Sequence, residues 1–387
     1  MKDRIYLDSA ATTIPSGEVL KILPEFLEYS YGNPDSMHTL GIEAERAVEL
    51  ARQTIAATMG AQSGEIIFTS SGTEANNLAI FGAAEAKGRR GNKIIITDAE
   101  HPSVYMPALE LEKKGFEIIY LSAAGGKIDL DGLKNNLDER VILISAMLVN
   151  NETGNIFDIG KIIQTAEESG QRDNLYIHCD AVQAYGKIQI DLNKLKIDMM
   201  SVSAHKIHGL KGAGALFLRR GKRIIPQIFG GGQENGMRSS SLNTPGIFTF
   251  GKAAKEAAEN LQKNMEYIKS LYDYSVFKIK EKCPNAVFNQ RGDISKYILS
   301  LRLPGIKSEV MLNYLSKRGI YVSSGSACSE KRKKKHGANR VLRSYGLDGA
   351  AAESTIRVSF SKYNDFSEID EFAAALAEMD STRRGTP

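Results

Sequence analysis

The chain has 387 residues, and 50 basic against 46 acidic side chains give it a formal net charge of only +4. This near balance argues against a protein that binds nucleic acid over its whole surface, and the length suggests two or three domains, or one large and one small. The three cysteines form no CxxC pair, so neither a zinc ribbon nor a thioredoxin motif is available, and free thiols fit a reducing cytosol. The start, MKDRIYLDSAATT, lacks the apolar run of a signal peptide, and we find no apolar stretch of about 18 residues, so we expect a cytoplasmic protein without a membrane span.

Helical and strand-like segments alternate along the chain before residue 230. Helices are predicted over 43–58, 74–87, 103–114 and 158–169, and strands over the short apolar runs 94–97, 141–149, 175–179, 198–203 and 214–218. This alternation predicts the α/β class, with a mainly parallel sheet covered by helices on both faces. Catalytic groups are then expected at the carboxyl ends of the strands.

The pattern changes after GGGQENGMRSSSLNTPG, residues 230–246. One long helix is predicted over 247–282, followed by a strand (296–303), a helix (307–317), a strand (319–323), a loop (324–336), a helix (338–345), a strand (354–360) and a helix (366–380). This order is typical of a smaller α+β domain. We predict a large domain over 16–260 and a small domain formed by 1–15 together with 261–387.

An acid and a lysine each follow a predicted strand in the middle of the chain. Asp180 ends the strand in YIHCDAVQAYGK, and Lys206 follows the strand in DMMSVSAHKIHG. Singly, the acid could be a helix cap and the lysine a solvated loop residue. Together they suit pyridoxal phosphate, because a lysine amine can form a Schiff base with its aldehyde and a carboxylate can keep its ring nitrogen protonated. Gln183 could reach the phenolic oxygen of the same ring.

Three further strand ends carry polar groups. FTSSGTEANNLAI (68–80) predicts a strand, a turn and a helix whose first amides could bind the phosphate through Gly72 and Thr73, although an ordinary helix cap is the simpler interpretation. His101, in TDAEHPSV, could stack on the cofactor ring and carry protons. Asn150 and Asn151, in LVNNETGNI, could touch the cofactor or the substrate.

With these motifs in place, the chain resembles the cysteine desulfurases of the NifS/IscS type, within the class V aminotransferases. The resemblance runs nearly end to end and rests on motifs in the family's order: IYLDSAATT, GNPDSMH, FTSSGTEANNLAI, EH, VNNETG, DAVQAYGK, SAHKIHG, GGGQENGMRS, SSGSAC and STIRVSF. It implies the fold type I of pyridoxal-phosphate-dependent transferases and a homodimer with its sites near the subunit interface.

The resemblance also implies a role for each matching residue. Lys206 would hold the cofactor, Asp180 and Gln183 would contact its nitrogen and phenolic oxygen, and His101 would stack on the ring and move protons. Gly72, Thr73, Ser203 and His205 would bind the phosphate, Asn151 would contact cofactor or substrate, and Ser241 would reach the phosphate in the partner subunit. Arg357 would bind the substrate carboxylate, assisted by Asn33, and Cys328 would be the cysteine that carries the persulfide.

The implied activity is removal of sulfur from L-cysteine, which gives L-alanine and a persulfide on Cys328. The sulfur would pass to an acceptor protein, an iron–sulfur scaffold or a thiolation enzyme, and the sequence predicts no direct nucleic-acid or membrane partner. Alternatives are selenocysteine lyase activity, another pyridoxal reaction such as transamination, or a sulfur-carrier scaffold without turnover. Cys328 argues against transamination, and an intact set of Lys206, Asp180 and His101 argues against a scaffold.

The segment after Cys328 departs from the family pattern. SEKRKKKHGANR (329–340) is longer than the typical version and far more basic, with five basic residues in succession at 331–335. It could be a solvated surface loop, a source of positive charge that lowers the pKa of the thiol, or a docking surface for an acidic acceptor. We predict no resident metal, since His205 and His208 have no third ligand nearby, although Cys328 could transiently hold a nascent iron–sulfur cluster.

Overall fold

The computed structural model describes residues 4–324 and 340–384, and its largest element is a seven-stranded sheet in the order β2-β8-β7-β6-β5-β3-β4. The strands are β2 (Ile66–Thr69), β3 (Lys93–Thr97), β4 (Glu117–Leu121), β5 (Val141–Met147), β6 (Tyr176–Asp180), β7 (Met199–Ser203) and β8 (Gly214–Leu218). The neighbours from β4 to β7 pair in parallel, whereas β8 pairs antiparallel with both β7 and β2. The predicted α/β class with a mainly parallel sheet is confirmed.

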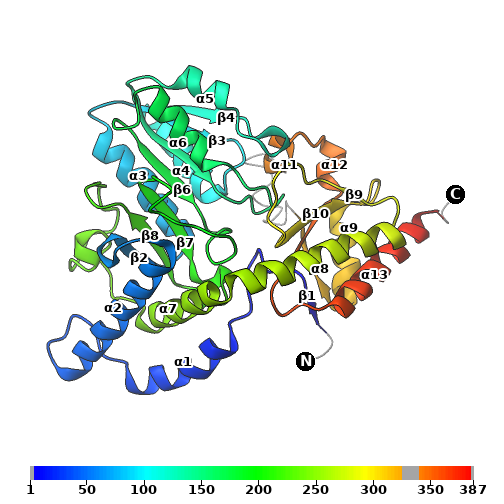
Figure 1. Cartoon of the computed structure of the whole chain (residues 1–387), viewed down its shortest axis with the longest axis horizontal. Helices are drawn as coiled ribbons and strands as arrows, with labels where there is room; N and C mark the ends of the chain where they lie inside the picture. The colour runs from blue at the N-terminus through cyan, green and yellow to red at the C-terminus, as the bar shows by residue number, and fades with distance from the viewer. Residues whose placement is uncertain (1–3, 325–339, 385–387) are drawn as a thin grey trace.

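Helices cover both faces of this sheet (Figure 1). They are α1 (Gly17–Tyr29), α2 (Thr39–Met59), α3 (Gly72–Lys87), α4 (Pro102–Lys113), α5 (Leu130–Asn136), α6 (Ile159–Glu168) and α7 (Thr244–Glu259). Successive side chains of a strand point to opposite faces. In β3, Ile95 therefore packs in the core with α2, α6 and α7, whereas Ile94 and Ile96 pack in the core with α3 and α4. Burial on both sides explains why these strands read as unbroken apolar runs.

A second hydrophobic core lies in the C-terminal part of the chain. Its helices are α8 (Leu261–Lys282), α9 (Ser308–Lys317), α11 (Arg340–Ser344), α12 (Gly349–Glu353) and α13 (Phe366–Arg384), and its strands are β9 (Val287–Phe288), β10 (Ile298–Arg302), β11 (Ile320–Tyr321), β12 (Ser323–Ser324) and β13 (Thr355–Ser359). β1 (Ile5–Tyr6) pairs in parallel with β11, and Figure 1 shows it in blue beside this part. Ile5 and Leu7 join the same core. The division of the chain at residue 260 stays a prediction.

The prediction of one helix over 247–282 is wrong, because the segment forms α7 and α8 with a break at Asn260. Asn260 has φ −106° and ψ 10°, and its side chain donates to the carbonyl of Glu256 at 2.9 Å. An asparagine side chain that bonds to nearby backbone favours a helix end over a helix interior. The sequence analysis also missed α1, α12 and the edge strand β4. No helix in the described ranges is long and apolar enough to cross a membrane.

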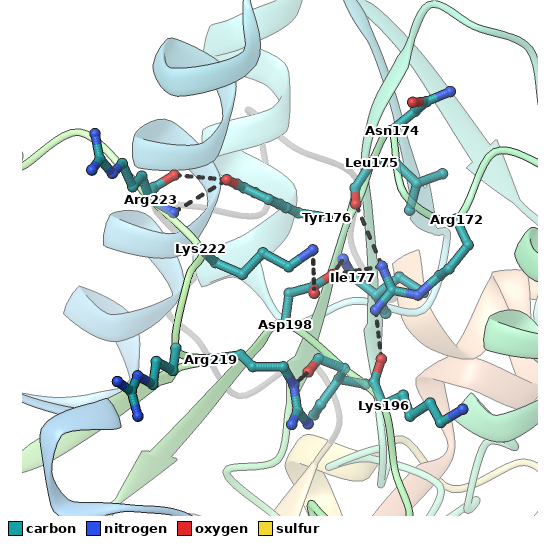
Figure 2. A network of polar contacts seen from close by, with 12 residues as sticks. Arg172, Asn174, Leu175, Tyr176, Ile177, Lys196, Asp198, Arg219, Lys222 and Arg223 are labelled. Carbon is teal, nitrogen blue, oxygen red and sulfur yellow. Dashed lines mark hydrogen bonds and ion pairs between the residues drawn. The ribbon is translucent and has the colours of Figure 1, made fainter.

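A buried charge network fixes the amino end of β7 (Figure 2). Asp198, which has no solvent exposure, accepts the amide of Ile177 at 2.8 Å and pairs with Arg172 at 2.9 Å and Lys222 at 3.0 Å. A buried carboxylate requires such partners to offset the loss of hydration. This network holds β6 and β7 together at the edge opposite to the one where β7 ends.

Candidate active site

Five strands end at one edge of the sheet, because β2, β3, β5, β6 and β7 all run in the same direction. The segment after each strand carries one of the predicted site residues: Gly72 follows β2, His101 follows β3, Asn151 follows β5, Asp180 ends β6 and Lys206 follows β7. Gly72 and Lys206 thereby lie at the same edge of the sheet, although they are 134 residues apart in the sequence. The prediction that the strand ends carry the site depends on this topology.

Lys206 closes a single 3-10 turn, Ala204–Lys206, directly after β7. Its Nζ donates to the backbone carbonyls of Ala10 at 2.6 Å and Ala11 at 2.7 Å. The hydroxyl of Thr13 donates to the carbonyl of His205 at 3.0 Å, so the N-terminal segment lies across the lysine turn. The amine is therefore held in one place by backbone from the other end of the chain.

The surroundings lower the pKa of Lys206 to about 8. Burial is the largest cause and the positive charge of Arg357 adds to it, whereas Asp8 and Asp180 oppose both. Loss of hydration disfavours the charged form of an amine, which is why burial lowers its pKa. A lysine with this pKa offers a neutral, nucleophilic amine to a carbonyl group at a mildly alkaline pH.

Asp180 is buried and belongs to a chain of hydrogen bonds that ends at His101. Its Oδ1 accepts the amide of Val182 at 2.9 Å, and its Oδ2 accepts from Asn76 Nδ2 at 2.8 Å. Asn76 also donates to Ser103 Oγ at 2.8 Å, which lies 2.7 Å from His101 Nδ1. The sequence analysis missed Asn76, whose signal is its position one helical turn after Gly72, on the face of α3 that meets the sheet.

The ring of His101 is set up as a neutral imidazole. The backbone amide of Ser103 donates to its Nδ1 at 3.1 Å, so the proton of the neutral ring lies on Nε2. Burial lowers the pKa of His101, an effect that Asp180 opposes and that the positive charges of Lys206 and Arg357 reinforce. The neutral ring can therefore accept a further proton only at Nδ1, and Nδ1 must first give up its hydrogen bond from the Ser103 amide.

The start of α3 offers a cradle for an anion. Ser71 caps the helix, and a Cβ placed on Gly72 would lie 2.6 Å from Val182 Cγ2, so only glycine leaves the backbone accessible here. Ser203 Oγ lies next to it, buried and without a hydrogen-bond partner in the described part of the chain. The neighbouring His205 has its pKa lowered to about 4, by burial first and by Lys206 second, so it is a neutral donor or acceptor.

Arg357 presents a guanidinium group beside Lys206 from β13. It is 7% exposed, and it donates to the carbonyl of Asn151 at 2.8 Å and to Asp8 Oδ1 at 2.8 Å. Its Nε is buried and has no partner among the described residues. Ser323 donates to the other oxygen of Asp8 at 2.8 Å. A buried arginine with a spare donor suits a carboxylate ligand.

Two acids near the site, the buried Glu100 and the partly buried Glu152, were not found from the sequence. Glu100 Oε1 accepts from Thr97 and from the amide of Met147, and burial raises the pKa of Glu100 to about 8. Glu152 has its pKa raised to about 7 by burial, which Arg357 opposes. Both lie in motifs, EH and VNNETG, and the signal that could have found them is an acid in the short segment that follows a buried strand.

Three other predicted site residues are exposed to solvent in the single chain. Asn33 is exposed between α1 and α2, where its side chain accepts the amide of Asp35 at 3.1 Å. Ser241 is exposed in the segment before α7. Thr73 is exposed in the first turn of α3. Cys328 and the basic residues 331–335 lie outside the described residues.

A nucleophilic lysine, a buried carboxylate and an anion cradle at the end of an α/β sheet define a class of protein, the enzymes built around pyridoxal phosphate. Residues 5–372 match the family model "Aminotransferase class-V". The chain therefore belongs to the class-V aminotransferase family, which depends on pyridoxal phosphate. The orphaned hydroxyl of Ser203 and the open backbone at Gly72 fit the phosphate of that cofactor.

Relatives and solved structures agree with this assignment over nearly the full length. The chain is 37% identical to "Cysteine desulfurase IscS" of Clostridium botulinum, with 99% of this chain and 96% of that protein covered. A solved structure described as a NifS-like protein superposes with a TM-score of 0.91 at 35% identity, covering 98% of this chain and 100% of the other. Another, described as SspA in complex with cysteine, has a TM-score of 0.79 at 30% identity and covers 93% and 100%.

Proposed function

We propose that this protein is a cysteine desulfurase, an activity for which its full-length relatives are named. The observation that carries the proposal is the placement of Arg357 beside Lys206 and Asp180, so that a carboxylate-binding group faces the amine that holds the cofactor. A free amino acid bound there would have its carboxylate on Arg357 and its Cα next to Lys206. The neighbour solved with cysteine supports the choice of that amino acid as substrate.

The residues divide the work according to their positions. Pyridoxal phosphate, when bound, supplies an electron sink for the electron pair released at the substrate Cα. Asp180 would keep a proton on the cofactor's ring nitrogen, and Gln183 would donate to its phenolic oxygen. Lys206, once displaced by the substrate, would remove the proton from Cα and later return one. His101 would stack on the ring and take part in these transfers through its Nε2.

The sulfur step belongs to Cys328 in this proposal. Its thiolate attacks the sulfur of the bound cysteine, an S–S bond forms, and the bond between Cβ and sulfur breaks with its electron pair left on the carbon side. That carbon takes up a proton, so the products are L-alanine and a persulfide on Cys328. Selenocysteine could undergo the same step, and it is the second substrate to be assayed.

Replacing Cys328 by serine tests the sulfur step. With L-cysteine and a small thiol reductant, the wild type is expected to release alanine and sulfide in equal amounts. Cys328→Ser is expected to keep the visible absorbance of the bound cofactor and to lose sulfide release by at least about 100-fold, because a hydroxyl is a far weaker nucleophile than a thiolate. Cys283→Ala, in the C-terminal core, serves as the matched control. Survival of sulfide release in Cys328→Ser would exclude the persulfide role.

The acceptor is proposed to dock on the basic segment 331–335. Changing Lys331, Lys333 and Lys335 to glutamine is expected to slow sulfur transfer to an acidic iron–sulfur scaffold protein, because electrostatic attraction raises association rates. Alanine formation with a small reductant should stay unchanged. A loss of equal size in both assays would contradict the docking role.

The remaining partner assignments are also proposals. In a homodimer, the exposed Ser241 of one subunit would reach the phosphate held by the other, and Asn33 would assist Arg357. The cytoplasmic location expected from the sequence stays a prediction.

A further inference from the structure

Lys187 is a buried lysine without an acidic partner. Its residue is 6% exposed, and none of the carboxylates in the described ranges forms an ion pair with it. Burial is the main cause that lowers its pKa to about 7, and the charges of Lys206 and Arg357 add to the effect. Lys187 and Lys206 line one small cavity of about 30 Å³. Burying an ionisable amine without an acidic partner costs free energy of folding, so we examined what the amine of Lys187 contacts.

Among the described residues, the amine of Lys187 forms one hydrogen bond, to Gln183. Lys187 Nζ donates to Gln183 Oε1 at 3.0 Å, while Gln183 Nε2 donates to the carbonyl of Ala10 at 2.7 Å. The two contacts fix which way the amide points. Turning it over would place its NH2 group against the donor Lys187 and its oxygen against the acceptor Ala10, so both hydrogen bonds would be lost.

The orientation of this amide matters because of what lies next to it. Lys206 Nζ donates to the same Ala10 carbonyl at 2.6 Å, so Gln183 Nε2 and Lys206 Nζ are neighbours around one oxygen. An NH2 group has two hydrogens, and Ala10 takes one. On the cofactor, the phenolic oxygen is on the ring carbon next to the one whose aldehyde reacts with the lysine. The second hydrogen of Gln183 would thus be available to donate to that oxygen when the cofactor is bound.

The turn that carries both residues is built against the lysine loop. Gly186 has φ +70°, and a Cβ there would lie 2.8 Å from Ile207 Cγ2, so a larger residue would push the turn away from Lys206. Lys187 Nζ also lies 5.8 Å from the ring centroid of Tyr297, which covers it from the C-terminal part of the chain. These contacts fix the position of the Lys187 amine, so that it can donate to the side-chain amide of Gln183.

We propose that Lys187 is a positioning residue for the cofactor: it holds the amide of Gln183 so that the NH2 group, and not the oxygen, faces the phenolic oxygen of pyridoxal phosphate. The inference rests on the proposed role of Gln183. Both the ammonium and the neutral amine of Lys187 can donate to Gln183 Oε1, and the Ala10 carbonyl can only accept from Gln183 Nε2, so the amide keeps its orientation over the working pH range. Without Lys187, the buried oxygen of Gln183 would lack its donor, and only the hydrogen bond to the Ala10 carbonyl would hold the amide in place.

A double-mutant cycle of Lys187→Met and Gln183→Ala tests this proposal. Methionine keeps the length and apolar stem of the lysine and has no charge to bury, so the variant is expected to fold. The apparent dissociation constant of pyridoxal phosphate and the position of its visible absorption band are measured on full-length protein freed of cofactor. Lys187→Met is expected to weaken binding by about fivefold and to shift the band, as for the loss of one hydrogen bond. Lys93→Met is the control, because it also removes a buried lysine, at the start of β3 and away from the strand ends that carry the site. It shows how much the loss of any buried lysine affects cofactor binding.

The proposal is decided by comparing the effect of Lys187→Met when Gln183 is present with its effect when Gln183 is replaced by alanine. In Gln183→Ala, the further change Lys187→Met is expected to alter neither the affinity nor the band, because the residue acts through the amide. An equal loss of affinity in both backgrounds, or no loss and no shift when Gln183 is present, would overturn the proposal. A wild-type protein that binds no pyridoxal phosphate would instead refute the proposed function, so the two failures are distinguishable.

Discussion

Replacement of Lys206 by alanine is expected to abolish the visible absorbance of the bound cofactor and to lower alanine formation by at least about 10³-fold. The amine is held by two backbone carbonyls in the end of the sheet, and burial with Arg357 keeps its pKa at about 8. In the proposed reaction, the same amine both links the cofactor and moves the proton at the substrate Cα. Alanine removes both functions, and no other described lysine amine occupies this position.

Absorbance spectra and alanine release from L-cysteine measure the effect of Lys206→Ala. Lys211→Ala is the matched control, since Lys211 is an exposed lysine in the loop that follows. The control should keep both the absorbance and the turnover. If Lys206→Ala kept its absorbance and turned over within about tenfold of the wild type, the lysine would contribute less than a general acid–base group usually does, and its assignment would be wrong.

Replacement of Asp180 by asparagine is expected to lower kcat by about 10³-fold while pyridoxal phosphate still binds. Asparagine has nearly the same shape and can still accept the amide of Val182, but it lacks the charge that would keep a proton on the ring nitrogen. A ring nitrogen without its proton is a weaker electron sink, so the effect should fall on kcat more than on KM. Because the charge of Asp180 raises the pKa of His101, its loss should lower that pKa further.

The matched control for Asp180→Asn is Asp198→Asn, which removes another buried carboxylate, next to the opposite end of the neighbouring strand β7. Asp198 lies in the network at the opposite edge, with Arg172 and Lys222 (Figure 2). Its loss should lower the stability of the fold, because two partly buried cations lose their partner, but should leave kcat per bound cofactor unchanged. Steady-state kinetics and thermal unfolding of both variants separate the two cases. Equal losses of kcat would contradict a specific role for Asp180.

Much of the large sheet could be predicted because its strands carry a strong local signal. β3, β5, β6, β7 and β8 are buried on both faces, so each is a short apolar run bounded by polar or glycine-rich turns. β4 was missed because it lies at the sheet edge with partly exposed residues, where the apolar pattern is weaker. The break at Asn260 was missed because a helix-compatible pattern continues through it, and only the local side-chain hydrogen bond shows where the helix ends.

The candidate site was predicted as a set of residues and not as an arrangement. The sequence indicated Lys206, Asp180 and His101 through the chemistry of their side chains, and a parallel sheet explained why the strand ends should meet. Arg357 was indicated only by the resemblance to the family. The hydrogen-bond chain from Asp180 through Asn76 to His101, and the contact of Arg357 with Asp8, join residues that are far apart in the chain. Asparagine and aspartate are common in turns and caps, so residue type alone distinguishes neither Asn76 nor Asp8 from an ordinary surface residue.

The sequence by itself determined the α/β class, the family and the chemistry available at the strand ends, because these depend on local burial patterns and on side-chain types. Only the tertiary structure decided that the N-terminal segment closes the site. The carbonyls of Ala10 and Ala11 hold Lys206, and the carbonyl of Ala10 also accepts from Gln183, whose orientation Lys187 fixes. Backbone carbonyls are present at every residue and have no side-chain signature, so their role as partners follows only from where the chain places them.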